Sequence, residues 1–224
     1  MSASISVNIW VNIWSDIACP WCYIGKRKFE AALADFDGAE DVAVTYHSFE
    51  LAPDTPVDFE GSEVDFLASH KGMDPAQVEQ MLRQVSAVAS DVGLDYDFDT
   101  VRHTKTLLAH QALHFAKAHG KQLELVERLF AAYFVQGRHV GRAEELADLG
   151  AEVGLDREAM LTALQEGTYA EDVDADLAQA REYGIQGVPF FVVGGRYGIS
   201  GAQKPEVFTQ ALQQVRTEQA GASS

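Results

Sequence analysis

The 224-residue sequence predicts an α/β protein in which a large helical segment interrupts a small sheet. Three observations support this fold class. Strand-like and helix-like segments alternate in the order β-α-β at the start of the chain, a long stretch of helical pattern follows, and a β-β-α segment closes the chain. A helical block of about 120 residues between the halves of one sheet is better explained as an inserted domain than as a loop.

The first strand is expected over residues 7–14, where Val-Asn-Ile-Trp occurs twice in succession. A four-residue repeat preserves the two-residue period of a strand, so each side chain stays on its face.

The residues after Cys22 have apolar side chains at helical spacing, at Ile24, Phe29, Ala32 and Leu33. Residues 42–49 alternate like a strand and are rich in β-branched and aromatic residues. This order describes a βαβ unit, whose two strands should be parallel neighbours.

The helical segment begins after a turn-rich stretch at residues 51–56. Asp74 and Pro75 supply the N-cap and the first-turn proline of a helix that runs to about Val92 and ends at Gly93. Further helices are expected over residues 104–119, 123–135, 142–153, 156–167 and 169–183.

Strand character returns at residues 188–193, and Gly194-Gly195 can adopt the positive φ angles of a tight hairpin that leads into residues 196–199. Lys204-Pro205 opens a last amphipathic helix, which should have one apolar face formed by Val207, Phe208, Leu212 and Val215. We therefore expect two domains, a discontinuous one over residues 1–60 and 184–224 and an inserted helical one over residues 61–183.

The chain has two cysteines, and they lie together in Cys19-Pro20-Trp21-Cys22, between the first strand and the first helix. Random placement would give this separation about once in a hundred cases, and two thiols at this spacing can close and reopen a small ring, as redox centres do. A structural zinc site needs four ligands, and no second CxxC follows, so no metal site is expected. A static disulfide over so short a loop would add little to the stability of the folded protein, because it constrains the unfolded chain only slightly. Two unrelated buried thiols remain as an alternative.

Composition narrows the classes of partner. The chain carries 34 acidic and 17 basic residues, a net charge of −17, which argues against binding to nucleic acid or to an anionic membrane. No stretch has the length and apolarity of a membrane span, and the N-terminus lacks a basic region before an apolar block. A cytoplasmic location is therefore expected, where a CxxC pair is more often catalytic than structural.

Three strings carry a resemblance to a known family. Ser15-Asp-Ile-Ala-Cys-Pro-Trp-Cys-Tyr-Ile-Gly-Lys26 closely resembles the FrnE-like group, cytosolic relatives of DsbA, and both Gly187-Val-Pro-Phe-Phe and Ile199-Ser-Gly-Ala-Gln agree with it. Related groups include the 2-hydroxychromene-2-carboxylate isomerases and the kappa-class glutathione transferases. The resemblance, which spans the chain, implies a DsbA-like thioredoxin fold with a large inserted all-helical domain.

One stretch departs from the pattern of this group. Its members often have Asn-Thr-x-x-Ala-His on an inserted helix that faces the active site. Here the matching stretch is Lys105-Thr106-Leu-Leu-Ala109-His110, with lysine in place of asparagine. A substrate-binding role is therefore not carried over to Lys105, and His110 is expected at the helix surface or at a domain interface.

The spacing of the motif gives its residues distinct roles. Cys19 should lie at the start of the helix, where free N–H groups and the positive end of the helix dipole stabilise a thiolate, so we expect it to be the nucleophile. Cys22, one turn further, should resolve the mixed disulfide. Pro20 suits the helix start because its missing N–H would be unpaired there. Trp21 is expected beside the sulfurs and partly exposed, although it can equally be a packing aromatic.

The resemblance also assigns a role to Val188 and Pro189. It implies a cis peptide bond between them that lies against Cys19, and it leaves the Val188 backbone available to pair with an extended substrate segment. The alternative is a trans proline at the start of an edge strand.

Charged residues near the motif have opposing expected effects. Asp16 would oppose a thiolate at Cys19 if its side chain pointed inward, whereas Lys26 and Arg27 would favour one.

Together these observations predict a thiol–disulfide oxidoreductase, or a disulfide isomerase, that exchanges electrons between Cys19–Cys22 and the disulfides of proteins or small thiols. No tightly bound cofactor is expected beyond the redox-active disulfide, and glutathione is a candidate co-substrate. One alternative is a glutathione-dependent isomerase or transferase, but those enzymes typically have serine in place of Cys19. A second alternative is a chaperone-like binding module, which the acidic, polar helices do not specifically support.

Overall fold

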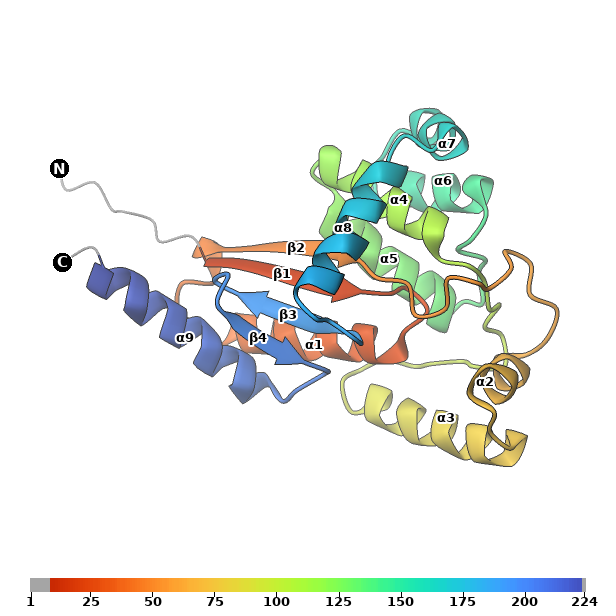
Figure 1. Cartoon of the computed structure of the whole chain (residues 1–224), viewed down its shortest axis with the longest axis horizontal. Helices are drawn as coiled ribbons and strands as arrows, with labels where there is room; N and C mark the ends of the chain where they lie inside the picture. The colour runs from red at the N-terminus through yellow and green to blue at the C-terminus, as the bar shows by residue number, and fades with distance from the viewer. Residues whose placement is uncertain (1–8, 223–224) are drawn as a thin grey trace.

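The computed structural model of the protein describes residues 9–222 and contains a four-stranded mixed sheet with helices on both faces (Figure 1). The strands lie in the order β2 (Val42–Ser48), β1 (Ile9–Ser15), β3 (Phe190–Val193) and β4 (Tyr197–Ser200). β1 and β2 are parallel, as predicted for a βαβ unit, and β3 is antiparallel to both of its neighbours. Residues 7 and 8 of the predicted first strand lie outside the described residues.

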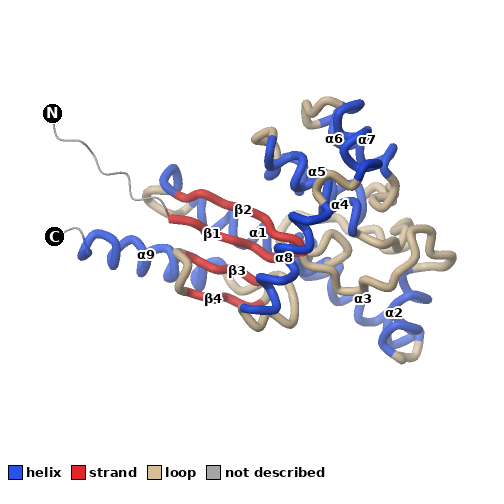
Figure 2. The backbone as a smooth tube through the Cα atoms, turned by 45° about the horizontal axis from the view of Figure 1, so that its top comes forward, coloured by secondary structure: helices blue, strands red, loops and turns tan. Residues whose placement is uncertain are grey.

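The helices form three groups. On one face of the sheet lie α1 (Pro20–Ala34) and α9 (Pro205–Ala222), and on the other lies α8 (Ala170–Glu182) (Figure 1). The helices between β2 and α8 gather beyond the carboxyl ends of β1 and β2 (Figure 2). They are α2 (Glu63–Lys71), α3 (Pro75–Ser90), α4 (Leu107–Ala118), α5 (Gln122–Phe134), α6 (Ala143–Glu152) and α7 (Arg157–Glu166), and a short 3-10 turn, Ala39–Asp41, precedes β2.

The predicted helices from α3 onward are confirmed to within three residues at each end, with the Asp74 and Asp156 side chains capping α3 and α7. The sequence did not single out α2, which begins at a capping box formed by Ser62 and Asp65. One helix face was assigned wrongly. Val207 is 38% exposed, whereas Phe208, Leu212 and Val215 are buried, because Val207 lies about 100° around the helix from the centre of that face.

The core of the protein runs from the sheet into the helical segment. Alternate residues of β1 (Ile9, Val11 and Ile13) pack with α1 and α9, while Trp14 points to the other face and packs against α8. The larger apolar cluster contains residues of α1, α4 and α5 as well as both cysteines. The start of α1 is therefore held on both sides by packed side chains.

A buried carboxylate joins α8 to the sheet and to α4. Asp176 of α8 lies 2.6 Å from Nδ1 of His47 and 2.9 Å from Nε2 of His114, and it accepts a hydrogen bond from the Ser48 backbone N–H at 2.8 Å. Burial alone would raise the pKa of Asp176, but the two imidazoles and the N–H outweigh it and hold this pKa well below its usual value. His47 is thus an interface residue between the sheet and α8.

A glycine allows α1 to pack closely against the segment that enters β3. A Cβ atom at Gly25 would lie 2.9 Å from Cγ of Pro189 and 3.5 Å from the ring of Phe191. A proline ring cannot rotate away from such a contact, so residue 25 has to lack a side chain for Pro189 to occupy its position.

We expect Gly25→Ala to lower the free energy of unfolding by about 1–3 kcal/mol, because the added methyl group overpacks the contact with Pro189. The loss should occur despite the higher helix propensity of alanine. Gly221→Ala is the matched control, since a Cβ at this helical glycine would meet no atom within 4 Å. Urea unfolding of the three proteins measures the effect, and equal stability of Gly25→Ala and wild type would contradict it.

Candidate active site

The two cysteines lie at the start of α1. Cys19 is the N-cap residue, with extended backbone angles (φ −92°, ψ 110°), and Pro20 occupies the first helical position. The Cys22 N–H donates to the Cys19 carbonyl at 3.0 Å, and the Cys19 N–H donates to the Asp16 carbonyl at 3.1 Å. Both cysteines are free thiols, only 4% and 2% exposed. The local hydrogen bonds thus place two thiols within one helical turn, as the spacing predicted.

The first thiol faces the segment that precedes β3. The Cys19 Sγ–H donates to the carbonyl oxygen of Val188 at 3.6 Å, and the Val188–Pro189 peptide bond is cis. The Pro189 carbonyl accepts a hydrogen bond from the Gly201 N–H at 2.8 Å, which anchors this segment to the turn after β4. Residues 169 positions apart in the chain therefore meet at Cys19.

The second thiol is held in its protonated form. Burial raises the pKa of Cys22 well above its usual value, and the neighbouring Cys19 sulfur raises it further. Cys19 lines the cavity described below, whereas Cys22 does not. Cys19 is thus next to the cavity, whereas Cys22 does not line it and its thiol resists ionisation.

Asp16 lies beneath the turn that carries the motif, and its side chain points inward. It accepts hydrogen bonds from the Leu51 N–H at 2.8 Å and the Ala18 N–H at 3.4 Å, and Nε2 of His110 lies 3.4 Å away. Burial alone would raise the pKa of Asp16, but His110 and the Leu51 N–H outweigh it and lower this pKa. His110 is therefore a buried interface residue. Of the two predictions for it, the interface is confirmed and the helix surface is wrong.

The charges of Lys26 and Arg27 are paired with carboxylates of α1 and α5. Lys26 Nζ lies 2.6 Å from a carboxylate oxygen of Glu127 on α5 and 2.5 Å from one of Glu30. Arg27 pairs with the other oxygen of Glu127 at 2.5 Å, and Tyr23 donates to that same oxygen at 2.6 Å. The expectation that these two cations favour a thiolate is not supported, because the cluster instead fastens α1 to α5.

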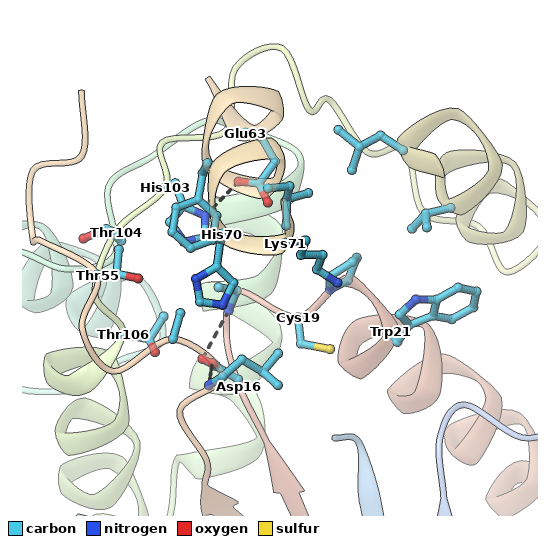
Figure 3. Close-up of a pocket in the computed structure, with 18 of the residues that line it drawn as sticks. Asp16, Cys19, Trp21, Thr55, Glu63, His70, Lys71, His103, Thr104 and Thr106 are labelled. Carbon is cyan, nitrogen blue, oxygen red and sulfur yellow. Dashed lines mark hydrogen bonds and ion pairs between the residues drawn. The ribbon is translucent and has the colours of Figure 1, made fainter. Parts of the chain in front are cut away.

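A cavity of about 270 Å³ opens beside Cys19, between the start of α1 and helices α2 and α3. Cys19, Pro20 and Trp21 form its α1 side, and Trp21 is 41% exposed, as expected. In Figure 3, His103 and Glu63 lie across the cavity from Trp21. The Cys19 residue therefore borders an open space of this volume.

Lys105 holds a loop that borders this cavity. Its Nζ donates to the Pro53 carbonyl at 2.7 Å, and its backbone N–H donates to the Pro56 carbonyl at 3.2 Å. The adjacent Thr104 hydroxyl donates to the Val57 carbonyl at 2.6 Å. Lysine at position 105 thus anchors the 51–57 loop.

Sequence reasoning brought together Cys19, Cys22, Pro20, Trp21, Val188 and Pro189, and the structure places all six in one region. It missed a buried Glu63–His103 pair in the cavity wall, since no motif marks either residue.

Among residues 9–222, no group of three or more histidine, cysteine or acidic side chains could hold a metal ion. None of the helices described is long and apolar enough to cross a membrane.

Comparison with known proteins places this geometry in a family. A model of the DSBA-like thioredoxin domain matches residues 10–213. The uncharacterized protein YwbO of Bacillus subtilis is 30% identical over 208 residues, which cover 92% of this chain and 96% of YwbO. The crystal structure of a probable DsbA oxidoreductase from Streptomyces coelicolor is 40% identical, with a TM-score of 0.88 over 94% of this chain and 91% of that one.

A more distant structure has the same fold. The cytosolic disulfide reductase DsbM from Pseudomonas aeruginosa, solved with GSH, is 20% identical and has a TM-score of 0.65 over 92% of this chain and 99% of its own.

The lowered pKa of Asp16 predicts a stability that depends on pH. A carboxyl group whose pKa is depressed by folding stabilises the protein above its unfolded value of about 3.9, and this contribution is lost as the pH falls through the folded value. At pH 7, Asp16→Asn should lower the free energy of unfolding by about 1–3 kcal/mol. Below pH 4 the difference from wild type should narrow, as measured by urea unfolding at several pH values.

The control for this measurement is Asp54→Asn, because Asp54 is exposed on the 51–57 loop. It should match wild type at every pH. A difference between wild type and Asp16→Asn that stays constant from pH 7 to pH 3 would contradict the prediction.

Proposed function

Because the chain belongs to the DSBA-like thioredoxin family of oxidoreductases, we propose that it exchanges thiols and disulfides through Cys19 and Cys22, with disulfides of proteins or small thiols as substrates. The observation that carries this proposal is the placement of Cys19. It lies at the helix N-terminus, against the Val188 carbonyl and beside an open cavity, with Cys22 buried behind it.

The first step is attack by Cys19. Its thiolate, favoured by the free N–H groups and the dipole of α1, attacks one sulfur of the substrate disulfide. The other substrate sulfur leaves as a thiolate, and a mixed disulfide links Cys19 to the substrate. Because burial raises the pKa of Cys22, this second thiol stays protonated while Cys19 reacts.

The second step releases the product. Cys22 loses its proton and attacks the Cys19 sulfur of the mixed disulfide, and the bound half of the substrate leaves as a thiol. Two electrons have then passed from the dithiol to the substrate, and Cys19–Cys22 is a disulfide. The reverse sequence oxidises a substrate dithiol, and incomplete resolution of the mixed disulfide allows isomerisation.

The Val188 backbone is the proposed docking point for the substrate chain. Val188 precedes β3, so its carbonyl oxygen is not used in the pairing of β3 with β1 or β4. An extended segment next to the substrate cysteine can add here as a strand while its sulfur reaches Cys19. The exposed Trp21 can pack against the same segment.

We also propose a cytoplasmic location, with no tightly bound cofactor and with glutathione as a candidate co-substrate. The DsbM structure, which contains GSH, supports the last point, although its similarity to this chain shows the fold alone. A glutathione-dependent isomerase or transferase is disfavoured, because Cys19 itself supplies a thiol where those enzymes rely on that of bound glutathione. No feature of the described residues favours a chaperone-like module.

The proposal predicts that the two cysteine variants behave differently. Cys19→Ser should lower the rate of insulin reduction, or of refolding of scrambled ribonuclease, by at least about a hundredfold, because a serine hydroxyl does not ionise near neutral pH. Cys22→Ser should form the mixed disulfide but release product slowly, so non-reducing electrophoresis should detect the trapped adduct. Full activity of Cys19→Ser would contradict the proposed function.

A further inference from the structure

A hydrogen-bonded group outside the cysteine pair lies in the wall of the cavity. Nδ1 of His103 is 2.8 Å from Oε2 of Glu63 and 3.3 Å from the hydroxyl of Tyr133. The ring of Phe66 stacks on the imidazole, with ring centroids 3.3 Å apart. All four side chains are buried, so the position and orientation of the imidazole are fixed by contacts on several sides.

These contacts determine which nitrogen of His103 carries the proton. A carboxylate only accepts hydrogen bonds, so Nδ1 has to be the donor to Glu63. In the neutral imidazole the other nitrogen, Nε2, is then an acceptor. Nε2 has no hydrogen-bond partner among the residues that the structure describes, although His103 is only 5% exposed and lines the cavity. The bond to Glu63, drawn as a dashed line in Figure 3, thus leaves Nε2 as the free acceptor of an imidazole that lines the cavity.

The rest of the cavity is suited to an apolar body. Leu67, Leu82 and Val85 line it together with Phe66, and Cys19 lies at its α1 side. Its volume of about 270 Å³ is just below the range of pockets for drug-sized ligands, so it suits one large side chain better than a whole cofactor.

The charges in the cavity select against an anionic group. Two carboxylates, those of Asp16 and Glu63, lie in its buried part, each beside one histidine. The basic residues that line it, His70 and Lys71, are exposed to solvent. A further carboxylate placed at Nε2 of His103 would lie close to Glu63 in a poorly solvated space. A neutral hydrogen-bond donor at the end of an apolar group fits better.

We propose that this cavity is a specificity pocket for a tyrosine side chain near the reactive cysteine of a polypeptide substrate. The aromatic ring packs between the apolar residues of α2 and α3, and its hydroxyl donates a hydrogen bond to Nε2 of His103. This inference rests on the proposed thiol–disulfide exchange, because the pocket borders Cys19 and positions the substrate sulfur for attack.

The test uses single-turnover exchange with short peptides. Each peptide has one cysteine, joined by a disulfide to thionitrobenzoate, and carries tyrosine, phenylalanine or glutamate at a position flanking the cysteine. Attack by Cys19 of the reduced protein on the peptide sulfur releases the coloured thionitrobenzoate anion, and Cys22 then frees the peptide as a thiol. The rate of colour release reports recognition by the pocket and needs no added reductant.

We expect the tyrosine peptide to react about tenfold faster than the phenylalanine peptide at one of the flanking positions, since a hydrogen bond to a buried acceptor discriminates by this order. The glutamate peptide should be the slowest of the three. Equal rates for tyrosine and phenylalanine, or a fastest rate for glutamate, would overturn the inference and leave the proposed function intact. No reaction with any peptide would overturn both.

Two variants of His103 separate recognition from a structural role. In His103→Asn, the shorter amide occupies the place of the imidazole Nδ1 and can still form a hydrogen bond with Glu63, but no atom occupies the place of Nε2. In His103→Gln, the longer amide reaches the place of Nε2. His103→Asn should therefore lose the preference for tyrosine over phenylalanine, and His103→Gln should keep part of it. Each ratio is measured within one variant, so a general loss of stability or rate cancels. An unchanged ratio in His103→Asn would overturn the inference.

Discussion

The contact between the start of α1 and the segment that enters β3 determines the rest of the site. Pro189 packs on Gly25, and the Val188 carbonyl accepts a hydrogen bond from the thiol of Cys19, so two parts of the chain that are 169 positions apart converge on one sulfur. Phe29 of α1 packs against the rings of Phe191 and Phe208, which holds the helix on the sheet. Because the core is close-packed on both sides of α1, the thiol cannot shift without disturbing the sheet.

Polar groups beneath the motif extend this constraint into the helical segment. Asp16 links the turn before α1 to His110 of α4 and to the backbone of Leu51, and Lys105 holds the 51–57 loop at Pro53 and Pro56. These bonds fix the wall of the cavity next to Cys19. The inserted helices are thus part of the site, since they supply the groups that surround the thiol and the space into which a substrate can enter.

The sequence predicted most of the elements because local patterns specify them. Apolar periodicity, Asp74 as an N-cap and the Gly194-Gly195 turn each act within a few residues, and the structure follows them. The same reasoning failed where a side chain depends on its neighbours in space. Val207 belongs to an apolar run but lies off the packed face, and Lys26 and Arg27 are close to the motif in sequence while Glu127 of α5 neutralises them.

The chain alone therefore determined the candidate cysteine pair and the order of strands and helices, because a CxxC at a strand-to-helix junction combines two thiols and a helix N-terminus within four residues. Only the tertiary structure decided what surrounds that pair. The hydrogen bond between Glu63 and His103 joins residues 40 positions apart, and the contact between the buried side chains of Asp16 and His110 joins residues 94 positions apart. No local pattern encodes such contacts, since they form only when segments far apart in the chain pack together.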